Sequence, residues 1–417
     1  MNGPKRLSIC YAAPGQNLLP SAGPTRNVLN LANALSERAD VTVAFRSIRE
    51  PIHTKNYKVI AIEPYEKVSA EIKDDNAVRG LHPVRHIAYC WRLRSFSEQQ
   101  ASSYDIVLEK GWRLSGYLLD SFRRKGVPGV LIENNVHFWS ERLTDVRAVA
   151  KYILHFGAHC VASRCTQRAA GVIAETHEMK TMLIKYRGVP PERIEVVGLG
   201  VDHNVFRPMD QLSARDLLNI SPDALLLLYV GGMDEYHDLE PVIEGLAATR
   251  PPSVELHVVG DGEYRRRYEA KARSAQVNAR FYGHVPHAVI PQYIAAANLC
   301  IAPYRTSACH NGIVPFSTLK IPEYMACGRP VASVPGGQIQ RLIEDGISGF
   351  LFPNGASSWI SFLKKLPSRE QLTDMGAAAS RAVESLGWEK TATRYLEICE
   401  SLIGTERVST RQLFISD

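Results

Sequence analysis

The chain has 417 residues, of which 45% are hydrophobic and 22% are charged, which is typical of a soluble globular protein long enough for two domains. No apolar run approaches the roughly 20 residues that span a bilayer, and no signal-peptide core precedes the first strand, so we expect a cytoplasmic location and reduced cysteines. The net charge of +6 is spread along the sequence, which argues against a nucleic-acid partner and leaves peripheral membrane contact open.

The first half of the chain alternates strand and helix patterns. Residues 7–11 predict a buried strand, and a turn-rich loop with Pro14 and Gly23 follows. Apolar positions 28, 31, 32 and 35 predict an amphipathic helix. Further strands are predicted at 41–45, 58–62, 105–108, 129–132 and 171–174, whereas the polar residues 66–85 indicate an insertion or loop. This order predicts a parallel α/β domain with ligands at the carboxyl ends of its strands.

A second alternation begins with the apolar run LLLLYVGG and continues through ELHVVGDG, ARFYG, NLCIAPY and RPVASV. It predicts a second parallel-sheet domain. We place the boundary near Arg207, which gives domains at 1–206 and 207–384. A last helix is expected within 385–404, and the polar tail 405–417 is expected to fray.

The most informative stretch is STLKIPEYMACGRPVASVPGG, residues 317–337. Ser317 is a suitable N-cap, so a helix is predicted to begin near Thr318 and to stop at Gly328, before a strand launched by Pro330. A helix start that follows a polar loop favours anionic ligands, because its amides are unpaired and its macrodipole is positive there. The carboxylate inside this stretch belongs to Glu323.

Five residues of this stretch form a recognisable pattern: Glu323, Ala326, Gly328, Pro330 and Val331. The pattern resembles the donor-site signature of retaining, two-domain glycosyltransferases of the family-four type, the glycosyl transferases group 1. The resemblance runs from residue 7 to about residue 400 and includes the passage GLGVDHNVF before the second domain.

The resemblance implies a GT-B fold, an α/β architecture in which two Rossmann-like parallel-sheet domains face each other across a cleft and the last helix crosses back to the first domain. It also implies retaining transfer of a sugar, most commonly a hexose, from a nucleotide diphosphate-sugar to an acceptor hydroxyl. A UDP-sugar is the default donor by family frequency alone. No cofactor is implied.

The resemblance assigns donor-binding roles within the central stretch. Glu323 matches the residue that holds the nucleotide ribose. The backbone of Ser317, Thr318 and Leu319 would face the phosphates or the sugar hydroxyls, and Lys320 would be a counter-charge for the diphosphate and a catalytic group. The chain departs from the pattern at Pro315, where the family has an earlier Glu near the sugar.

The resemblance also assigns donor-binding roles to residues in other loops, by their position in the sequence. Gly232 and His237 stand where the family presents an Arg and a Lys to the diphosphate, so both of these cations are missing. The turn at Gly262 would border the nucleotide, and the backbone at His284 and Val285 would read the base.

In the first domain, Gly23 lies in a loop at a strand end, and His137 follows the strand VLI. A histidine after this strand recurs in related enzymes near the donor sugar and acceptor, so His137 is a catalytic candidate.

Two other functions remain open from the sequence. A nucleotide-sugar 2-epimerase shares the architecture, and the missing Glu and cations leave room for a catalytically silent nucleotide-sugar-binding protein. A metal site is not expected. His155 and His159 would share a helical face, but Cys160 and Cys165 lack a paired short spacing, and Cys160 lies about 100° round the helix from His159. The sequence does not identify the base, the sugar, the oligomeric state or the acceptor, which could be a natural product, a lipid-linked saccharide or a polysaccharide.

Overall fold

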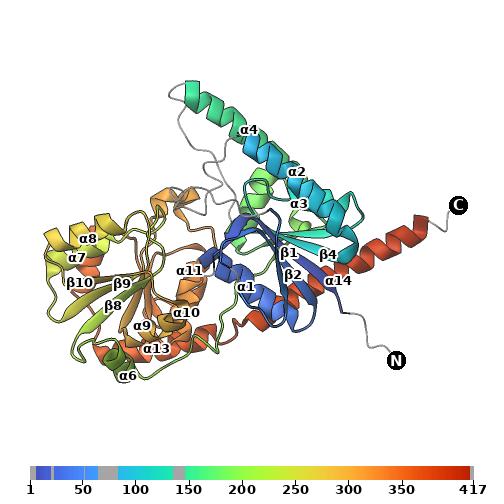
Figure 1. Ribbon diagram of the computed structural model, residues 1–417. Coiled ribbons are helices and arrows are strands. Elements are labelled where there is room, and N and C mark those ends of the chain that lie inside the picture. Colours follow the sequence, from blue (N-terminus) through green and yellow to red (C-terminus); the bar gives the residue numbers. More distant parts are fainter. Residues whose placement is uncertain (1–5, 20–22, 51, 64–82, 135–145, 414–417) are drawn as a thin grey trace, which may run out of the picture. The chain divides into compact units, whose positions relative to one another are not determined.

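A computed structural model describes residues 6–19, 23–50, 52–63, 83–134 and 146–413 (Figure 1). The chain divides into two compact units, one of Met1–Gly198 with Trp388–Asp417 and one of Leu199–Gly387. The division falls at Leu199, whereas the sequence placed it near Arg207. His137 and most of the predicted insertion at 66–85 lie outside the described residues.

The first unit contains a seven-stranded parallel sheet in the order β3-β2-β1-β4-β5-β6-β7. The strands are β1 (Ser8–Leu18), β2 (Asp40–Ile48), β3 (Lys58–Ala61), β4 (Ile106–Lys110), β5 (Gly129–Glu133), β6 (Gly171–Ala174) and β7 (Ile194–Val196). The order reverses between β1 and β4, and in such a sheet ligands bind beyond the carboxyl ends of the strands at the reversal.

Helices cover both faces of this sheet (Figure 1). The helices are α1 (Gly23–Ser36), α2 (Pro83–Gln100), α3 (Tyr117–Arg123), α4 (Val146–Arg168), α5 (His177–Met182) and α14 (Trp388–Leu413). Helices α2 and α4 both pack against α3 over a core that includes Val107 and Leu131, whereas α14 packs against α1. On α14, Tyr395, Leu396 and Cys399 are buried, and the helix continues to Leu413, past the end predicted at residue 404.

Strand β1 is longer than predicted. Its pairing with β2 is interrupted between Ala13 and Asn17 and then resumes to Leu18, so the predicted loop at Pro14 is part of a strand. Proline has no N–H to donate to a sheet, and the irregularity accommodates it. The short strand β7 was not predicted.

The second unit contains a six-stranded parallel sheet in the order β10-β9-β8-β11-β12-β13. The strands are β8 (Leu225–Val230), β9 (Val254–Val259), β10 (Ala279–Gly283), β11 (Leu299–Ala302), β12 (Val331–Ser333) and β13 (Gly349–Leu351). The predictions located all of these except β13. Strand β8 is a continuous apolar run because the sheet has a core on each face, one of them around Tyr324 and the other around Trp359.

The helices of this unit are α6 (Gln211–Leu217), α7 (Glu240–Thr249), α8 (Arg265–Ser274), α9 (Ile290–Ala296), α10 (Lys320–Ala326), α11 (Gly337–Leu342), α12 (Ala356–Leu363) and α13 (Arg369–Val383). Helix α7 packs closely on α12, because Gly245 of α7 leaves room for the Trp359 side chain of α12. A Cβ added at Gly245 would lie 2.7 Å from the Cβ of Trp359. Helix α10 packs on α13 and carries the central motif of the sequence. No helix among the described residues is both long enough and apolar enough to cross a membrane.

Candidate functional site

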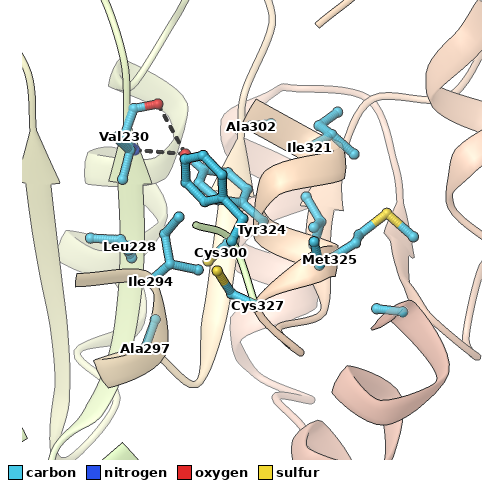
Figure 2. Close-up of a cluster of buried hydrophobic side chains, with 14 of the residues drawn as sticks. Leu228, Val230, Ile294, Ala297, Cys300, Ala302, Ile321, Tyr324, Met325 and Cys327 are labelled. Carbon is cyan, nitrogen blue, oxygen red and sulfur yellow. Dashed lines mark hydrogen bonds between the residues drawn. The ribbon is translucent and has the colours of Figure 1, made fainter. Parts of the chain in front are cut away.

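Helix α10 is fixed against the end of strand β8 by one tyrosine. The Tyr324 hydroxyl donates to the carbonyl of Val230 at 3.0 Å and accepts from its amide at 2.7 Å (Figure 2). Ile321, Met325 and Cys327 are buried on the same side of the unit, in the cluster drawn in Figure 2. The buried face of α10 therefore sets where Lys320 and Glu323 lie relative to the loop that follows β8.

The start of α10 differs from the prediction. The helix begins at Lys320 and its N-cap is Leu319, with no side-chain capping bond, so the prediction of a Ser317 N-cap was wrong. Had Ser317 been the cap, the residue that donates to the Thr318 carbonyl would be Pro322, which has no N–H. The observed first bond runs from the Glu323 amide to the Leu319 carbonyl at 3.1 Å, one residue beyond the proline.

The segment before α10 has polar groups that the protein does not use. The Ser317 hydroxyl oxygen is buried and has no hydrogen-bond partner in the structure. Among the described residues, no carbonyl accepts from the amides of Ser317, Thr318 or Leu319. The Thr318 hydroxyl, in contrast, accepts from Tyr304 at 2.7 Å. Unmatched buried polar groups are uncommon in proteins and suit a polar ligand.

Lys320 is enclosed by aromatic rings and a glycine loop. Its Nζ donates to the Tyr229 hydroxyl at 3.1 Å, lies 4.5 Å from the centre of the Tyr229 ring, and would be 2.6 Å from a Cβ at Gly231. Burial lowers the pKa of Lys320 to about 7, against the opposing effect of Asp234 and Glu323. An anion placed beside this ammonium would favour its charged form.

Glu323 is on the same helix, one turn after Lys320. Burial raises the pKa of its carboxyl to about 8, and the charge of Asp202 acts in the same direction, while Lys320 opposes it. Within the described part of the chain, no group donates a hydrogen bond to the carboxylate of Glu323. Glu323 is half-buried, and a carboxylate that the protein supplies with no donor is suited to accept hydroxyl donors from a ligand.

The loop after β8 lies against the loop after β9, and glycines make this possible. A Cβ at Gly260, whose φ is +124°, would be 2.0 Å from the Gly231 carbonyl oxygen. A Cβ at Gly262 would be 2.3 Å from the Met233 carbonyl oxygen. The predicted turn at Gly262 is thus a backbone contact between two strand ends. Gly232 has space around it, and its carbonyl accepts from the Tyr229 hydroxyl.

His237 follows in the same loop, as an isolated bridge residue paired with Tyr304 and not at a helix start. Its Nδ1 lies 2.7 Å from the Asp234 carboxylate. Burial, and secondarily the charge of Lys320, lower the pKa of His237 to about 4. His237 is therefore neutral near pH 7 and can offer a hydrogen bond without a positive charge. Arg305, another nearby cation, is paired with Asp238 at 3.1 Å.

The remaining predicted residues are dispersed. His284 is exposed and Val285 packs against the core, both just after β10. Gly23 is exposed at the start of α1 in the first unit. The residue that the sequence reasoning missed is Tyr229, which contacts both Lys320 and Gly232. The sequence offered little indication of a role for Tyr229, because a tyrosine in an apolar strand is usually a core residue.

The first unit also buries ionisable groups at its strand ends. Lys110 and Glu175 form an ion pair in which each side chain is 1% exposed. Glu109 accepts from the Trp112 indole at 2.8 Å and from the amides of Gly116 and Leu119 at 2.8 and 3.0 Å. Burial raises the pKa of Glu109 to about 7, although these three hydrogen bonds oppose the shift. The protein itself satisfies this set of charges.

Solved structures similar to this chain show which fold class the two sheets define. Sucrose-phosphate synthase from Thermosynechococcus elongatus is 20% identical, with a TM-score of 0.72 over 99% of this chain and 100% of that one. HepE from Anabaena, in complex with UDP-glucose, is 18% identical, with a TM-score of 0.71 over 95% and 100%. The fold is GT-B, as predicted.

Sequence comparisons identify the family. Residues 22–205 match the model of Glycosyltransferase Family 4, and residues 224–366 match that of Glycosyl transferases group 1. The D-inositol 3-phosphate glycosyltransferase of Thermobispora bispora is 27% identical over 325 residues, which are 73% of this chain and 72% of the relative. The enzyme of the same name from Kribbella flavida is 29% identical over 72% of each chain. This chain belongs to the family-four glycosyltransferases of group 1 and is a glycosyltransferase, which confirms the predicted family.

Proposed function

We propose that the protein transfers a hexose from a UDP-sugar to an acceptor hydroxyl, with retention of the anomeric configuration and without a metal ion. The observation that carries the donor assignment is the pair Lys320 and Glu323. The two side chains are half-buried and lie one turn apart on α10, and burial shifts both of their pKa values. The choice of UDP is supported by family frequency and by the UDP-glucose bound to HepE.

The roles of the two groups follow from their charges. The Glu323 carboxylate would accept hydrogen bonds from both ribose hydroxyls, which replaces the donors that the protein lacks there. The Lys320 ammonium would lie beside the diphosphate and stabilise the negative charge that grows on it as the bond to the sugar breaks. The amides of Ser317, Thr318 and Leu319 would add hydrogen bonds to the phosphates or the sugar.

The proposed reaction needs no protein nucleophile. The bond between the anomeric carbon and the diphosphate oxygen breaks, and its electron pair leaves with the diphosphate. The acceptor oxygen then bonds to the anomeric carbon on the same face of the sugar, and the acceptor proton passes to the departing diphosphate. His137 is a further candidate near the acceptor, and we propose its test as His137→Ala, with loss of turnover at unchanged affinity for UDP.

A panel of nucleotide-sugars tests the proposal. The protein is screened for thermal stabilisation and for release of free nucleotide in the presence of candidate hydroxyl acceptors, which include D-inositol 3-phosphate, the compound in the names of the relatives. Stabilisation by a UDP-sugar with acceptor-dependent release supports the proposal. Binding without turnover favours a silent binding protein, and conversion of the donor to an isomer favours a 2-epimerase.

Two further measurements test the mechanism. Proton NMR of the new linkage should show the anomeric configuration of the donor, and an inverted coupling pattern would reject the retaining assignment. Turnover should survive an excess of chelator, whereas a complete loss that magnesium restores would show that the reaction needs a metal.

A further inference from the structure

Three hydrogen-bonded side chains of the second unit, here called the polar triad, have no part in the reaction proposed above. Glu255 and His257 lie on β9, and Tyr282 lies on the neighbouring strand β10. The His257 ring is fully buried, with Nε2 at 3.0 Å from the Glu255 carboxylate and Nδ1 at 2.9 Å from the Tyr282 hydroxyl. Because a carboxylate only accepts hydrogen bonds, Nε2 carries the proton and Nδ1 accepts from Tyr282. Both ring nitrogens are therefore used.

The polar triad lies on a face of the sheet that is otherwise apolar. The residues of β8 paired with Glu255 and His257 are Leu226 and Leu228, which belong to the core around Tyr324. Burial lowers the pKa of His257, against the opposing effect of Glu255, so the imidazole is neutral near pH 7. An apolar side chain would fill this position without desolvating a polar ring. A fully satisfied buried network instead specifies one arrangement of the segments that it joins, here β9 and β10.

Tyr282 is the residue at which β10 departs from regular pairing. Phe281 and Gly283 are paired with consecutive residues of β9, so Tyr282 is the extra residue of a β-bulge. Gly283 follows with a φ of +71°, and β10 is at the edge of the sheet. Bulges bend a strand and change the direction in which the next residues point, and they are common beside active sites. The hydrogen bond to His257 thus holds the bulged residue itself.

The bulge leads into the candidate site. The Gly283 carbonyl accepts from the Gly260 amide at 2.8 Å. Gly260 in turn lies against the carbonyl of Gly231, in the loop after β8 that borders the site. The residues that come directly after the bulge are His284 and Val285, whose backbone the family resemblance assigns to the nucleotide base. The direction of this backbone is therefore set at the position that the polar triad holds.

We propose that Glu255, His257 and Tyr282 position the backbone of His284 and Val285 and thereby set the selectivity of the donor site for its nucleotide base. The inference rests on the proposed function, because it takes the base of the donor to lie against this backbone. The three side chains are positioning residues and need not touch the donor. A base is distinguished by hydrogen bonds that a wrong base leaves unmade, so a displaced backbone weakens the correct base most.

The test compares the affinities for UDP and CDP by isothermal titration. The two nucleotides differ at one edge of the base, where O4 of uracil accepts a hydrogen bond and N4 of cytosine donates one. Tyr282→Phe keeps the ring and removes the hydroxyl, so the affinity for UDP should fall about fivefold with little change for CDP. His257→Leu should have the same effect, and the double variant should lose no more, because both changes remove one hydrogen bond.

A rescue variant and a matched control separate this role from a general loss of packing. His257→Asn keeps an oxygen close to the place of Nδ1 and should restore most of the preference for UDP. Tyr293→Phe is the control, because Tyr293 of α9 packs edge-on against Tyr282, with ring centroids 4.9 Å apart, and its hydroxyl is not part of the polar triad. This variant should bind both nucleotides as the wild type does. Unfolding temperatures identify any variant that does not fold, and Tyr282→Phe alone is sufficient for the test.

Hydrogen exchange without nucleotide gives a second readout that does not depend on the donor. The amides of residues 283–285 should exchange faster in Tyr282→Phe than in wild type, while those of β8 stay unchanged. Unchanged exchange at 283–285, or an equal loss of affinity for UDP and CDP, would overturn the positioning role. A wild-type preference for UDP that survives in Tyr282→Phe would do the same and leave the proposed function intact. A wild type without any preference for UDP would reject the UDP donor and, with it, this inference.

Discussion

Both units of this glycosyltransferase place ionisable side chains near the ends of their central strands. In the first unit they are buried, in the second they are half-buried, and the protein treats the two sets differently. In the first unit, Lys110 and Glu175 form an ion pair and Glu109 accepts three hydrogen bonds. In the second unit, Glu323 receives no hydrogen bond from the described residues and Lys320 has a tyrosine hydroxyl as its partner. Removing one partner of a buried pair that the fold satisfies leaves an uncompensated charge and destabilises the protein, whereas groups that the fold leaves unsatisfied lower stability until a ligand binds.

The largest effect should come from breaking the satisfied pair. Lys110→Met leaves the Glu175 carboxylate buried without a cation, and we expect a loss of about 3–5 kcal/mol in the free energy of unfolding of the first unit. Urea denaturation measures it. The double variant Lys110→Met with Glu175→Met should recover most of this loss, because no unpaired charge remains. An unchanged unfolding free energy in the single variant would contradict the comparison.

The opposite pattern is expected at Glu323. Glu323→Ala should reduce the affinity for UDP by about two orders of magnitude, since both ribose contacts are lost, while the unfolding temperature stays the same or rises. Glu323→Gln should fall between wild type and Ala. Isothermal titration with UDP and with 2′-deoxy-UDP measures the ribose preference, and Glu370→Ala on the exposed start of α13 is the control. A ribose preference that survives in Glu323→Ala would show that this residue is structural.

A smaller loss is expected at Lys320. Lys320→Met keeps the apolar stem between the aromatic rings and removes the charge, so affinity for UDP should fall about thirtyfold, with a smaller change for uridine, which has no phosphates. The folded state lowers the pKa of this lysine, which means that its charge destabilises the fold at pH values below its unfolded pKa. The Met variant should therefore be at least as stable as wild type at pH 7. Equal losses for UDP and uridine would remove Lys320 from the diphosphate site.

The smallest effect is in the pH dependence of binding. In the empty site Lys320 has a pKa of about 7, and a bound diphosphate raises it, so Lys320 should take up a proton on UDP binding between pH 7 and pH 9. Glu323, whose pKa is about 8, should release a proton when the ribose hydroxyls bind, so the uptake by Lys320 is read as the difference between wild type and Lys320→Met. The loss of the Lys320 charge should lower the affinity of the wild type for UDP several-fold as the pH rises from 7 to 9, and any change due to Glu323 adds to this effect. Titrations in buffers of different ionisation enthalpy count the protons. Lys320→Met should lose this uptake, and uptake that persists in the variant would assign it to another group.

The sequence was sufficient for the parts of the fold whose signals are local. Strand β8 was predicted because LLLLYV is a continuous apolar run, and the stop of α10 was predicted from Gly328, which has a φ of +71°. Strands β7 and β13 were missed because three residues carry too little periodicity. The strand at Pro14 was missed because its pairing depends on an irregularity that only the neighbouring strand defines.

The same limit applies to the site. Glu323 and Lys320 were found from a motif within one short segment. Tyr229 was not, because it meets Lys320 from a position 91 residues earlier in the chain. A neutral His237 above its usual pKa was expected from the sequence, but the lowering of that pKa to about 4 was not, since it depends on burial against Tyr304 and on the charge of Lys320. Contacts between distant segments decide which of the candidate groups carry a charge.

The position of α14 has a consequence for synthesis on the ribosome. The first unit is discontinuous, because Trp388–Asp417 completes it only after the whole of Leu199–Gly387 has been made. The second unit is continuous and can fold as soon as it emerges. Until α14 is translated, the surface of α1 on which it packs remains uncovered, and the buried side chains of Tyr395 and Cys399 are missing from the first unit. The N-terminal half is thus the last to mature, and a chain that stops before Trp388 would present chaperones and proteases with a finished second unit attached to an unfinished first one.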